Sequence, residues 1–264
     1  MKVAEDRRAL ITGGASGFGR EIARALRVSG AKVAIVDVNA DQAREAADEL
    51  GDGTLGLGAD VRSAAEVESA VGQAVEAFGG LDTLVISAGV FHMGELEGVS
   101  EEDWDRTLDV NLKGAFLASR AAMPELRKSE RGRVVMISSD AGQRGFAALA
   151  PYTASKFGLN GLMESIAAEV AADNVTVNCL CPVGCPTTGM GQEVLAEKIR
   201  LTGDSPEEIM AKAALTNPLG RNVLETDVSD AVLFLVSEHA SFITGVALDI
   251  DGGASLGTVP AAQG

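Results

Sequence analysis

Residues 8–19 read RALITGGASGFG, in which an apolar run, Arg8–Thr12, passes directly into a glycine-rich turn. Glycine permits a positive φ and a close approach of the backbone to a ligand, so this turn can wrap around a pyrophosphate. A helix predicted to begin near Arg20 would add free N–H groups and a partial positive charge at the same point. The stretch therefore predicts a strand–turn–helix unit that binds a dinucleotide. The alternative is a tight turn without a ligand.

Similar apolar runs alternate with helical patterns along nearly the whole chain. They are rich in Val, Ile and Leu at consecutive positions, which is typical of strands buried on both faces of a parallel sheet. Strand–helix alternation implies right-handed crossovers, so we expect an α/β fold with a doubly wound sheet of seven mostly parallel strands and helices on both faces. The predicted strands are Arg8–Thr12, Lys32–Asp37, Thr54–Ala59, Thr83–Ser87, Arg133–Ser138, Val175–Leu180 and Val246–Ile250.

The 264 residues contain no internal repeat and no break in composition, which predicts a single domain over residues 1–264. One segment departs from the alternation. Residues 185–219 form a charged, helix-prone insertion in which Ser205-Pro206-Glu207-Glu208 marks a helix start. We expect this insertion to cover a substrate pocket.

The formal net charge is −16, from 38 acidic and 22 basic residues. Such a charge repels phosphate backbones and anionic lipid surfaces, which disfavours nucleic acid or a membrane as a partner. The apolar stretches fall short of the ~20 residues that a membrane span needs, and Met1–Arg8 is too charged for a signal peptide. A cytoplasmic location is expected.

The cysteine and histidine content excludes several other classes of site. Cys179, Cys181 and Cys185 are an odd number at a spacing that is uncommon for zinc, and the only histidines, His92 and His239, lie far from them. We expect neither a disulfide framework nor a metal site, and a histidine-based hydrolase is poorly supported.

In an open α/β sheet, ligands bind beyond the carboxyl ends of the strands. Six predicted strands are followed there by polar or glycine-rich groups. These groups are Gly13–Gly19, Asp37, Asp60, Ser87–Gly89, Ser139 and Pro182.

Asp37 ends the second predicted strand, 18 residues after Gly19. A carboxylate at this place can accept hydrogen bonds from an adenine-ribose diol and would repel a 2′-phosphate. The glycine turn, Val38 and Asn39 provide no Lys or Arg to offset that repulsion. The sequence therefore predicts NAD rather than NADP as the cofactor.

Tyr152 and Lys156 are four residues apart in a helical stretch, which places them one turn apart on one face. A cation at about 4 Å contributes roughly 4 kcal/mol at an effective dielectric of 20, or about three pKa units. Desolvation offsets part of this, and the spacing still predicts a phenol that exchanges protons near the working pH. Ser139 could donate or accept a hydrogen bond at the substrate oxygen. Taken alone, the pair could be a surface pair and Ser139 a strand-end cap.

Together with the glycine turn, these residues give the sequence a clear resemblance to the short-chain dehydrogenase/reductase family, of the single-domain type with a Rossmann-type fold. The resemblance covers essentially the full length. The matching positions are Thr12-Gly-x-x-x-Gly-x-Gly19, Asp37, Asp60-Val61, Ala88-Gly89, Val110-Asn111-Leu112, Ser139, Tyr152, Lys156, Asn178–Pro182, Thr244-Gly245 and Asp251-Gly252-Gly253.

The resemblance implies a role for each position. Tyr152 would be the general acid/base, and Lys156 would lower its pKa and bind the nicotinamide ribose. Ser139 would orient the substrate oxygen, and Asn111 would hold a water that relays protons. The implied cofactor contacts are Gly13, Ser16, Gly17, Phe18, Gly19, Asp37, Val38, Asp60, Val61, Ser87, Ala88, Gly89, Val110, Tyr152, Lys156, Pro182, Val183 and Thr187, with Thr188 as an alternative to Thr187. No metal is required, and a homotetramer is expected.

The sequence departs from the family pattern at two places. Ser87 stands where the family usually has asparagine before Ala-Gly, and we expect only a local adjustment there. After the sixth strand the usual Pro-Gly is replaced by Pro182-Val183-Gly184-Cys185-Pro186, which leaves both Thr187 and Thr188 as candidates for the carboxamide contact.

The function predicted from these observations is hydride transfer between NAD(H) and a small secondary alcohol, polyol, sugar or the corresponding carbonyl compound. One alternative is a carrier-linked 3-oxoacyl reductase, which Asp37 and the acidic charge disfavour. A second is a non-catalytic dinucleotide sensor, which would not need the four residues Asn111, Ser139, Tyr152 and Lys156. The substrate pocket is expected to draw on residues 91–94, 140–146 and 184–219.

Overall fold

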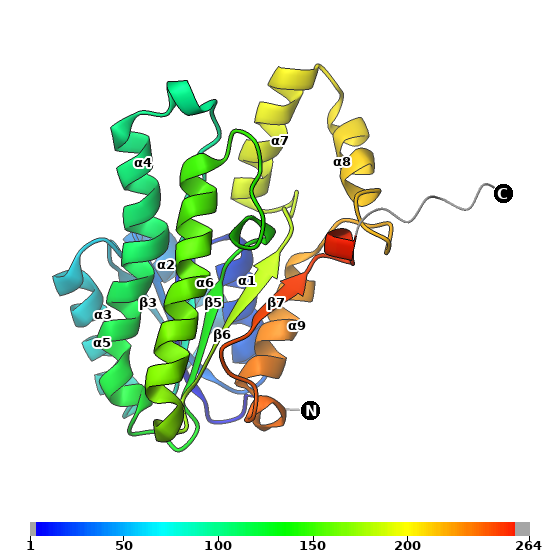
Figure 1. The fold of residues 1–264 in the computed structure, drawn as a ribbon. Helices are drawn as coiled ribbons and strands as arrows, with labels where there is room; N and C mark the ends of the chain where they lie inside the picture. Colours follow the sequence, from blue (N-terminus) through cyan, green and yellow to red (C-terminus); the bar gives the residue numbers. More distant parts are fainter. Residues whose placement is uncertain (1–3, 257–264) are drawn as a thin grey trace.

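The computed structural model describes residues 4–256, which contain one seven-stranded sheet in the order β3-β2-β1-β4-β5-β6-β7. Every neighbouring pair is parallel, as the doubly wound prediction requires. The strands are β1 (Arg8–Thr12), β2 (Lys32–Asp37), β3 (Thr54–Gly58), β4 (Thr83–Ile86), β5 (Arg133–Ile137), β6 (Thr176–Pro182) and β7 (Ala247–Ile250). The fold class is thus the predicted one, and Figure 1 shows the sheet between its helices.

Two hydrophobic cores, one on each face of the sheet, hold the helices in place. The helices α3 (Ala64–Phe78), α5 (Gly114–Leu126) and α6 (Ala150–Val170) bury apolar residues in the first core. The helices α1 (Gly17–Val28), α2 (Ala40–Leu50) and α9 (Glu225–Val236) do so in the second. Strand residues alternate between the two cores, so that Leu10 belongs to the first and Ile11 to the second. This explains why the strands are apolar at consecutive positions.

Five of the seven predicted strands differ from the structure by one or two residues at an end, and two boundary differences bear on the site. The helix after the glycine turn begins at Gly17, not near Arg20, so the second half of the glycine-rich sequence is already helical. The sixth strand extends to Pro182, two residues beyond the predicted end. In both cases residues with weak intrinsic preference are held in regular structure by their neighbours, since tertiary context overrides propensity.

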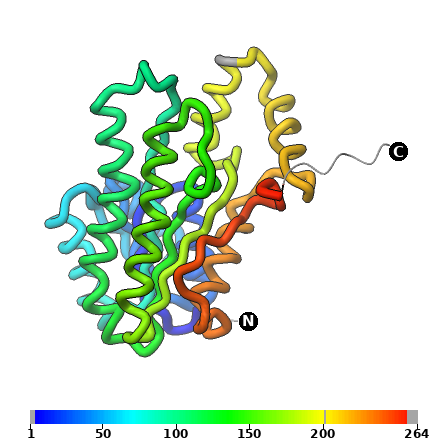
Figure 2. The backbone as a smooth tube through the Cα atoms, in the orientation of Figure 1, coloured from blue at the N-terminus to red at the C-terminus, as the bar shows by residue number. Residues whose placement is uncertain are grey.

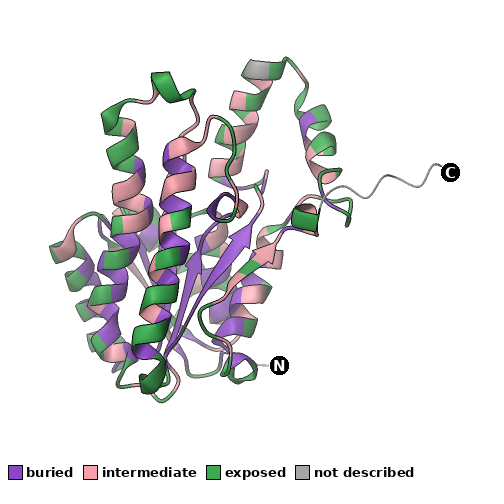
Figure 3. Ribbon diagram, in the orientation of Figure 1, coloured by how far each residue is buried: buried purple, intermediate pink, exposed green. Residues whose placement is uncertain are grey.

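The insertion predicted over residues 185–219 contains two helices, α7 (Gly189–Thr202) and α8 (Pro206–Ala214). Ser205 and Glu208 form a complete capping box at the start of α8. These helices stand beyond the carboxyl edge of the sheet and pack mainly against each other (Figures 1 and 2). Figure 3 shows that their surfaces are mostly exposed or half-buried, whereas the central strands are buried.

Candidate active site

A cavity of about 850 Å³ lies over the carboxyl ends of the strands. It runs from Asp37 on β2, past the ends of β1, β4 and β5, to Tyr152 on α6 and to α7. Of the residues expected to contact a cofactor, Gly19 and Thr187 lie outside its lining. The others line it: Gly13, Ser16, Gly17, Phe18, Asp37, Val38, Asp60, Val61, Ser87, Ala88, Gly89, Val110, Tyr152, Lys156, Pro182 and Val183.

The glycine turn is packed so tightly that two of its residues leave no room for a side chain. Gly13 has a φ of +65°, and a Cβ added there would lie 2.6 Å from the Ala88 Cα. A Cβ at Gly19 would lie 2.1 Å from the Gly13 carbonyl oxygen. Gly19 therefore lets α1 begin directly behind the turn, and its place in the motif is explained by packing. This bare backbone beside a helix start fits a pyrophosphate.

The Asp37 carboxylate is fixed at the mouth of this turn. Its Oδ2 accepts a hydrogen bond from the Ala15 N–H at 3.3 Å, and its Oδ1 accepts one from the Asn39 N–H at 3.1 Å. The neighbouring Val38 is exposed and also lines the cavity. A negative charge thus faces the end of the cavity near the glycine turn.

Asp60 has a partner that sequence reasoning missed. Both of its carboxylate oxygens accept hydrogen bonds from the Arg62 guanidinium, at 2.6 to 3.0 Å, which lowers the pKa of Asp60. Arg62 lines the cavity as well. The sequence offered one signal for this ion pair, the spacing of two residues between Asp60 and Arg62. The structure adds that the chain turns after Asp60 and brings the Arg62 guanidinium back to its carboxylate.

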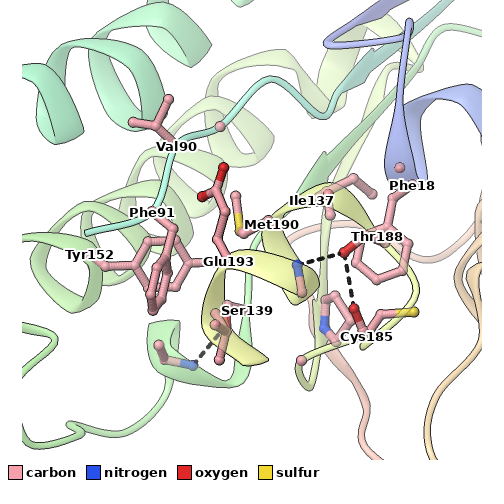
Figure 4. A pocket seen from close by; sticks show the side chains of 18 of the residues that line it. Phe18, Val90, Phe91, Ile137, Ser139, Tyr152, Cys185, Thr188, Met190 and Glu193 are labelled. Atoms are coloured by element: carbon pink, nitrogen blue, oxygen red, sulfur yellow. Dashed lines mark hydrogen bonds between the residues drawn. The ribbon is translucent and has the colours of Figure 1, made fainter. Parts of the chain in front are cut away.

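Tyr152 and Lys156 lie one turn apart on α6, as predicted, and both side chains are buried. The Tyr152 ring meets Phe91 edge to face with centroids 5.1 Å apart, and Figure 4 shows both rings above Ser139. Lys156 Nζ donates a hydrogen bond to the Ile137 carbonyl oxygen at 2.9 Å and lies 5.6 Å from the centroid of the Tyr152 ring. The strand end of β5 and one face of α6 therefore form one site.

The predicted lowering of the Tyr152 pKa is wrong for this structure. Burial raises the pKa of Tyr152 to about 12, while an interaction with the Ser139 hydroxyl lowers it and the charge of Asp140 raises it. Burial also lowers the pKa of Lys156 to about 8. Both shifts have the sign that desolvation imposes, since each disfavours the charged form. The Lys156 ammonium is bonded to a carbonyl oxygen, and its charge is not the dominant influence on the phenol.

Asn111 lies behind the cavity, in a π-helical turn that joins α4 (Glu101–Leu108) to α5. Its Oδ1 accepts a hydrogen bond from the Val90 N–H at 2.8 Å, and its Nδ2 donates to the Val90 carbonyl and the Ser155 hydroxyl, both at 3.0 Å. The side chain therefore ties the segment after β4 to α6. Its predicted role as a holder of water stays a prediction.

The structure separates the two candidate threonines after β6. Thr187 donates a hydrogen bond to Glu225 at 2.8 Å and lies outside the cavity lining, contrary to the prediction. Thr188 lines the cavity and caps α7, with its hydroxyl bonded to the Cys185 carbonyl and to the Gly191 N–H (Figure 4). Thr188 is the N-cap of α7, which begins at Gly189, so its side chain is held against the first turn of that helix.

The outer wall of the cavity comes from the insertion and from two loops, broadly as expected. Phe91, Met93 and Phe146 supply apolar groups from the loops, and α7 adds Met190 and Glu193, which Figure 4 shows at the pocket. Further lining residues of α7 and α8 are Gly191, Val194, Leu195, Lys198, Ile209, Met210 and Ala213. His92, in contrast, is not among the lining residues. Its Nδ1 lies 3.5 Å from the Asp103 carboxylate.

Residues 4–256 include no helix long and apolar enough to cross a bilayer. The same residues also present no group of three or more His, Cys, Asp or Glu side chains arranged to hold a metal ion.

Comparison with known proteins places this site in a family. Residues 7–199 match the short chain dehydrogenase family. The chain belongs to this family. A short-chain dehydrogenase is an oxidoreductase of alcohols or carbonyl compounds that binds a nicotinamide dinucleotide, and the glycine turn and the cavity described above fit such a cofactor.

Individual relatives span nearly the same length as this short-chain dehydrogenase. It is 37% identical to 2-(S)-hydroxypropyl-CoM dehydrogenase 3 of Xanthobacter autotrophicus over 92% of this chain and 94% of the relative. It superposes on sorbitol-6-phosphate 2-dehydrogenase from Erwinia amylovora with a TM-score of 0.89 and 31% identity, covering 93% and 98% of the two chains. For 3-ketoacyl-(acyl-carrier-protein) reductase from Brucella melitensis, complexed with NADH, the TM-score is 0.85, the identity 33% and the coverage 96% and 99%.

The ionisation of Tyr152 can be measured directly, because it is the single tyrosine of the chain. We expect its tyrosinate absorbance to appear with a midpoint near pH 12 in the folded protein, and near pH 10.0 in denaturant. In Ser139→Ala the midpoint should move higher, since the Ser139 interaction that lowers the pKa is lost. A folded-state midpoint below 10 would contradict the dominance of burial.

Proposed function

We propose that this short-chain dehydrogenase transfers a hydride between NAD(H) and a small secondary alcohol, polyol, sugar or the corresponding carbonyl compound. The observation that carries the proposal is the convergence of Ser139, Tyr152 and Lys156 on one cavity that also holds the glycine turn and Asp37. When bound, the dinucleotide would supply the hydride acceptor or donor. The chain's own residues then have to bind the cofactor and move one proton.

The residues proposed to hold the cofactor follow the cavity lining. The glycine turn and the start of α1 offer backbone N–H groups to the pyrophosphate, and Asp37 accepts from the adenosine ribose. Asp37 favours NAD because its carboxylate is already fixed by two backbone N–H groups and so cannot easily turn away from a 2′-phosphate. Lys156 and Thr188 are proposed to lie at the nicotinamide end, with Thr188 replacing Thr187.

The proton is proposed to move at the Tyr152 hydroxyl. In carbonyl reduction the phenol gives its proton to the substrate oxygen, and in alcohol oxidation the phenolate takes it back. Burial raises the pKa of Tyr152 and so favours the neutral phenol, which suits proton donation to a carbonyl oxygen. Lys156 carries an ammonium into the same buried site, and Asn111 keeps the segment after β4 against α6.

A second candidate function is reduction of a carrier-bound 3-oxoacyl group. The likeness to 3-ketoacyl-(acyl-carrier-protein) reductase favours it, and the apolar side chains of α7 and α8 would suit an acyl chain. The net charge of −16 weighs against an acidic carrier.

Replacement of Tyr152 by Phe tests the proposed chemistry. The ring and its contact with Phe91 are kept, so only the hydroxyl is lost. We expect turnover of ketones and secondary alcohols to fall by about a thousandfold, with NADH affinity nearly unchanged. Turnover is measured over a panel that includes simple ketones, ketoses and 3-oxoacyl thioesters, and the preferred class decides between the two functions. Near-normal turnover in Tyr152→Phe would remove Tyr152 from the mechanism.

Replacement of Asp37 by Ala tests the cofactor choice. We expect kcat/KM for NADH to fall at least about tenfold and that for NADPH to rise, because the hydrogen-bond acceptor and the repulsive charge are both lost. Asp41→Ala, which removes an exposed carboxylate on α2, is the matched control. The assignment to NAD fails if the unaltered protein already prefers NADPH.

We also propose that the enzyme is a homotetramer. Two groups of elements expose large apolar side chains: Trp104 on α4 and Phe116 on α5, and Phe234 on α9, Phe242 between α9 and β7, and Leu248 on β7. We take each group as a candidate apolar region, and two such regions can each become a two-fold contact, which together build a closed tetramer. The short apolar tail after Gly253 is a further predicted contact with a neighbouring subunit, and from residue 257 on it falls outside the described residues.

Light scattering measures this assembly. We expect a mass of about four times 27.1 kDa. Phe242→Asp should yield a smaller species, because it places a charge on one of the two apolar regions, whereas Leu215→Asp, at an exposed position after α8, should not. A monomeric wild type would contradict the proposal.

A further inference from the structure

Asp140 follows Ser139 directly and forms the shorter of the two hydrogen bonds of the Ser139 hydroxyl. The Ser139 hydroxyl donates a hydrogen bond to Asp140 Oδ1 at 2.9 Å, and the Ser139 oxygen accepts one from the Ala141 N–H at 3.2 Å. The Ser139 proton is thus held by a carboxylate. To donate to Tyr152 or to a substrate oxygen, the hydroxyl has to break this contact. Asp140 also lines the cavity.

A cation on the same loop holds this carboxylate in place. Arg144 Nη2 lies 3.5 Å from Asp140 Oδ2, and its guanidinium lies over the Phe146 ring, 5.5 Å from the centroid. Phe146 is itself part of the cavity lining. Arg144 therefore connects the pocket wall to Asp140 and partly offsets its charge.

The other charged groups around Asp140 come from β7 and α6. Asp249 on β7 has its pKa raised by burial and by Asp251 and Asp140, while Arg144 lowers it. Lys156 on α6 is bonded to the Ile137 carbonyl, and on β6 burial and the charge of Asp249 raise the pKa of Cys181. Among these groups, Asp140 is the one whose charge acts on Tyr152, raising its pKa.

We propose that Asp140 is a positioning residue of the catalytic site, which orients the Ser139 hydroxyl and sets, by its charge, the pH range in which the enzyme works. The inference rests on the proposed role of Tyr152 as the acid/base. A negative charge next to the phenol disfavours phenolate, so it extends the range in which Tyr152 can donate a proton to a carbonyl oxygen. It also means that a substrate oxygen must compete with Asp140 for the Ser139 proton. The ion pair with Arg144 weakens both effects, because it partly neutralises the Asp140 charge that acts on Tyr152 and that holds the Ser139 proton.

The pH dependence of kcat/KM for alcohol oxidation tests the proposal, because this activity requires the phenolate. In Asp140→Asn the rising limb should move to lower pH, by about half a unit, the size expected for one nearby charge with partial solvent screening. In Arg144→Gln it should move in the opposite direction, since the Asp140 charge is then unopposed. Asp140→Glu keeps the charge and should move the limb less than Asp140→Asn does.

The matched control is Glu169→Gln, at the far end of α6, which changes the net charge equally and should leave the limb in place. The tyrosinate absorbance of the single tyrosine should shift in the same directions in the same variants.

The proposal is overturned if the rising limb of the pH profile moves in neither Asp140→Asn nor Arg144→Gln, or if it moves the same way in both. If Asp140→Asn does not fold, the sign of the Arg144→Gln shift decides. Normal turnover in Tyr152→Phe would instead overturn the proposed function itself, so the two failures are distinguishable.

Discussion

The site depends on the parallel pairing of β1 with both β2 and β4. From β1 the chain extends the sheet outward through β2 and β3, and then crosses to the other side of β1 to place β4. The loops after β1 and β4 therefore diverge to opposite faces of the sheet, and a crevice opens between them. Because every strand is parallel, all the polar residues that end the strands gather at this one edge. The glycine turn, Asp37, Ser139 and the cavity are consequences of that order.

Burial is the second constraint, and it acts on the residues proposed to carry the chemistry. Tyr152 and Lys156 are both nearly excluded from solvent, and both pKa values move in the direction that neutralises the group. A buried phenol and a buried amine with opposed shifts are the type of pair that marks a functional site. Burial sets most of the shift in the Tyr152 pKa, and the charges of Asp140 and Arg144 are proposed to adjust that pKa further.

The sequence was sufficient for the sheet and for most of the site. Strands that are buried on both faces appear in the sequence as uninterrupted runs of apolar residues. The predicted boundaries of β1 and β2 are those of the structure. The placement of Tyr152, Lys156 and Ser139 at one cavity could be predicted because their spacing relative to a helix and a strand end is local. Arg62 was missed, and the choice between Thr187 and Thr188 was left open, because the direction of a side chain after a turn depends on where the next element starts. The sign of the Tyr152 pKa shift was wrong since spacing along a helix predicts proximity and says nothing of how much protein surrounds the pair.

The weak attachment of α7 and α8 to the rest of the molecule has an evolutionary consequence. These helices pack mainly on each other, yet they supply much of the wall around the reacting groups. Neither hydrophobic core contains a described residue of α7 or α8, so most substitutions in these helices change the cavity wall with little loss of fold stability. Substitutions in α7 and α8 can therefore change which molecules the cavity accepts while the residues proposed to carry hydride transfer stay unchanged.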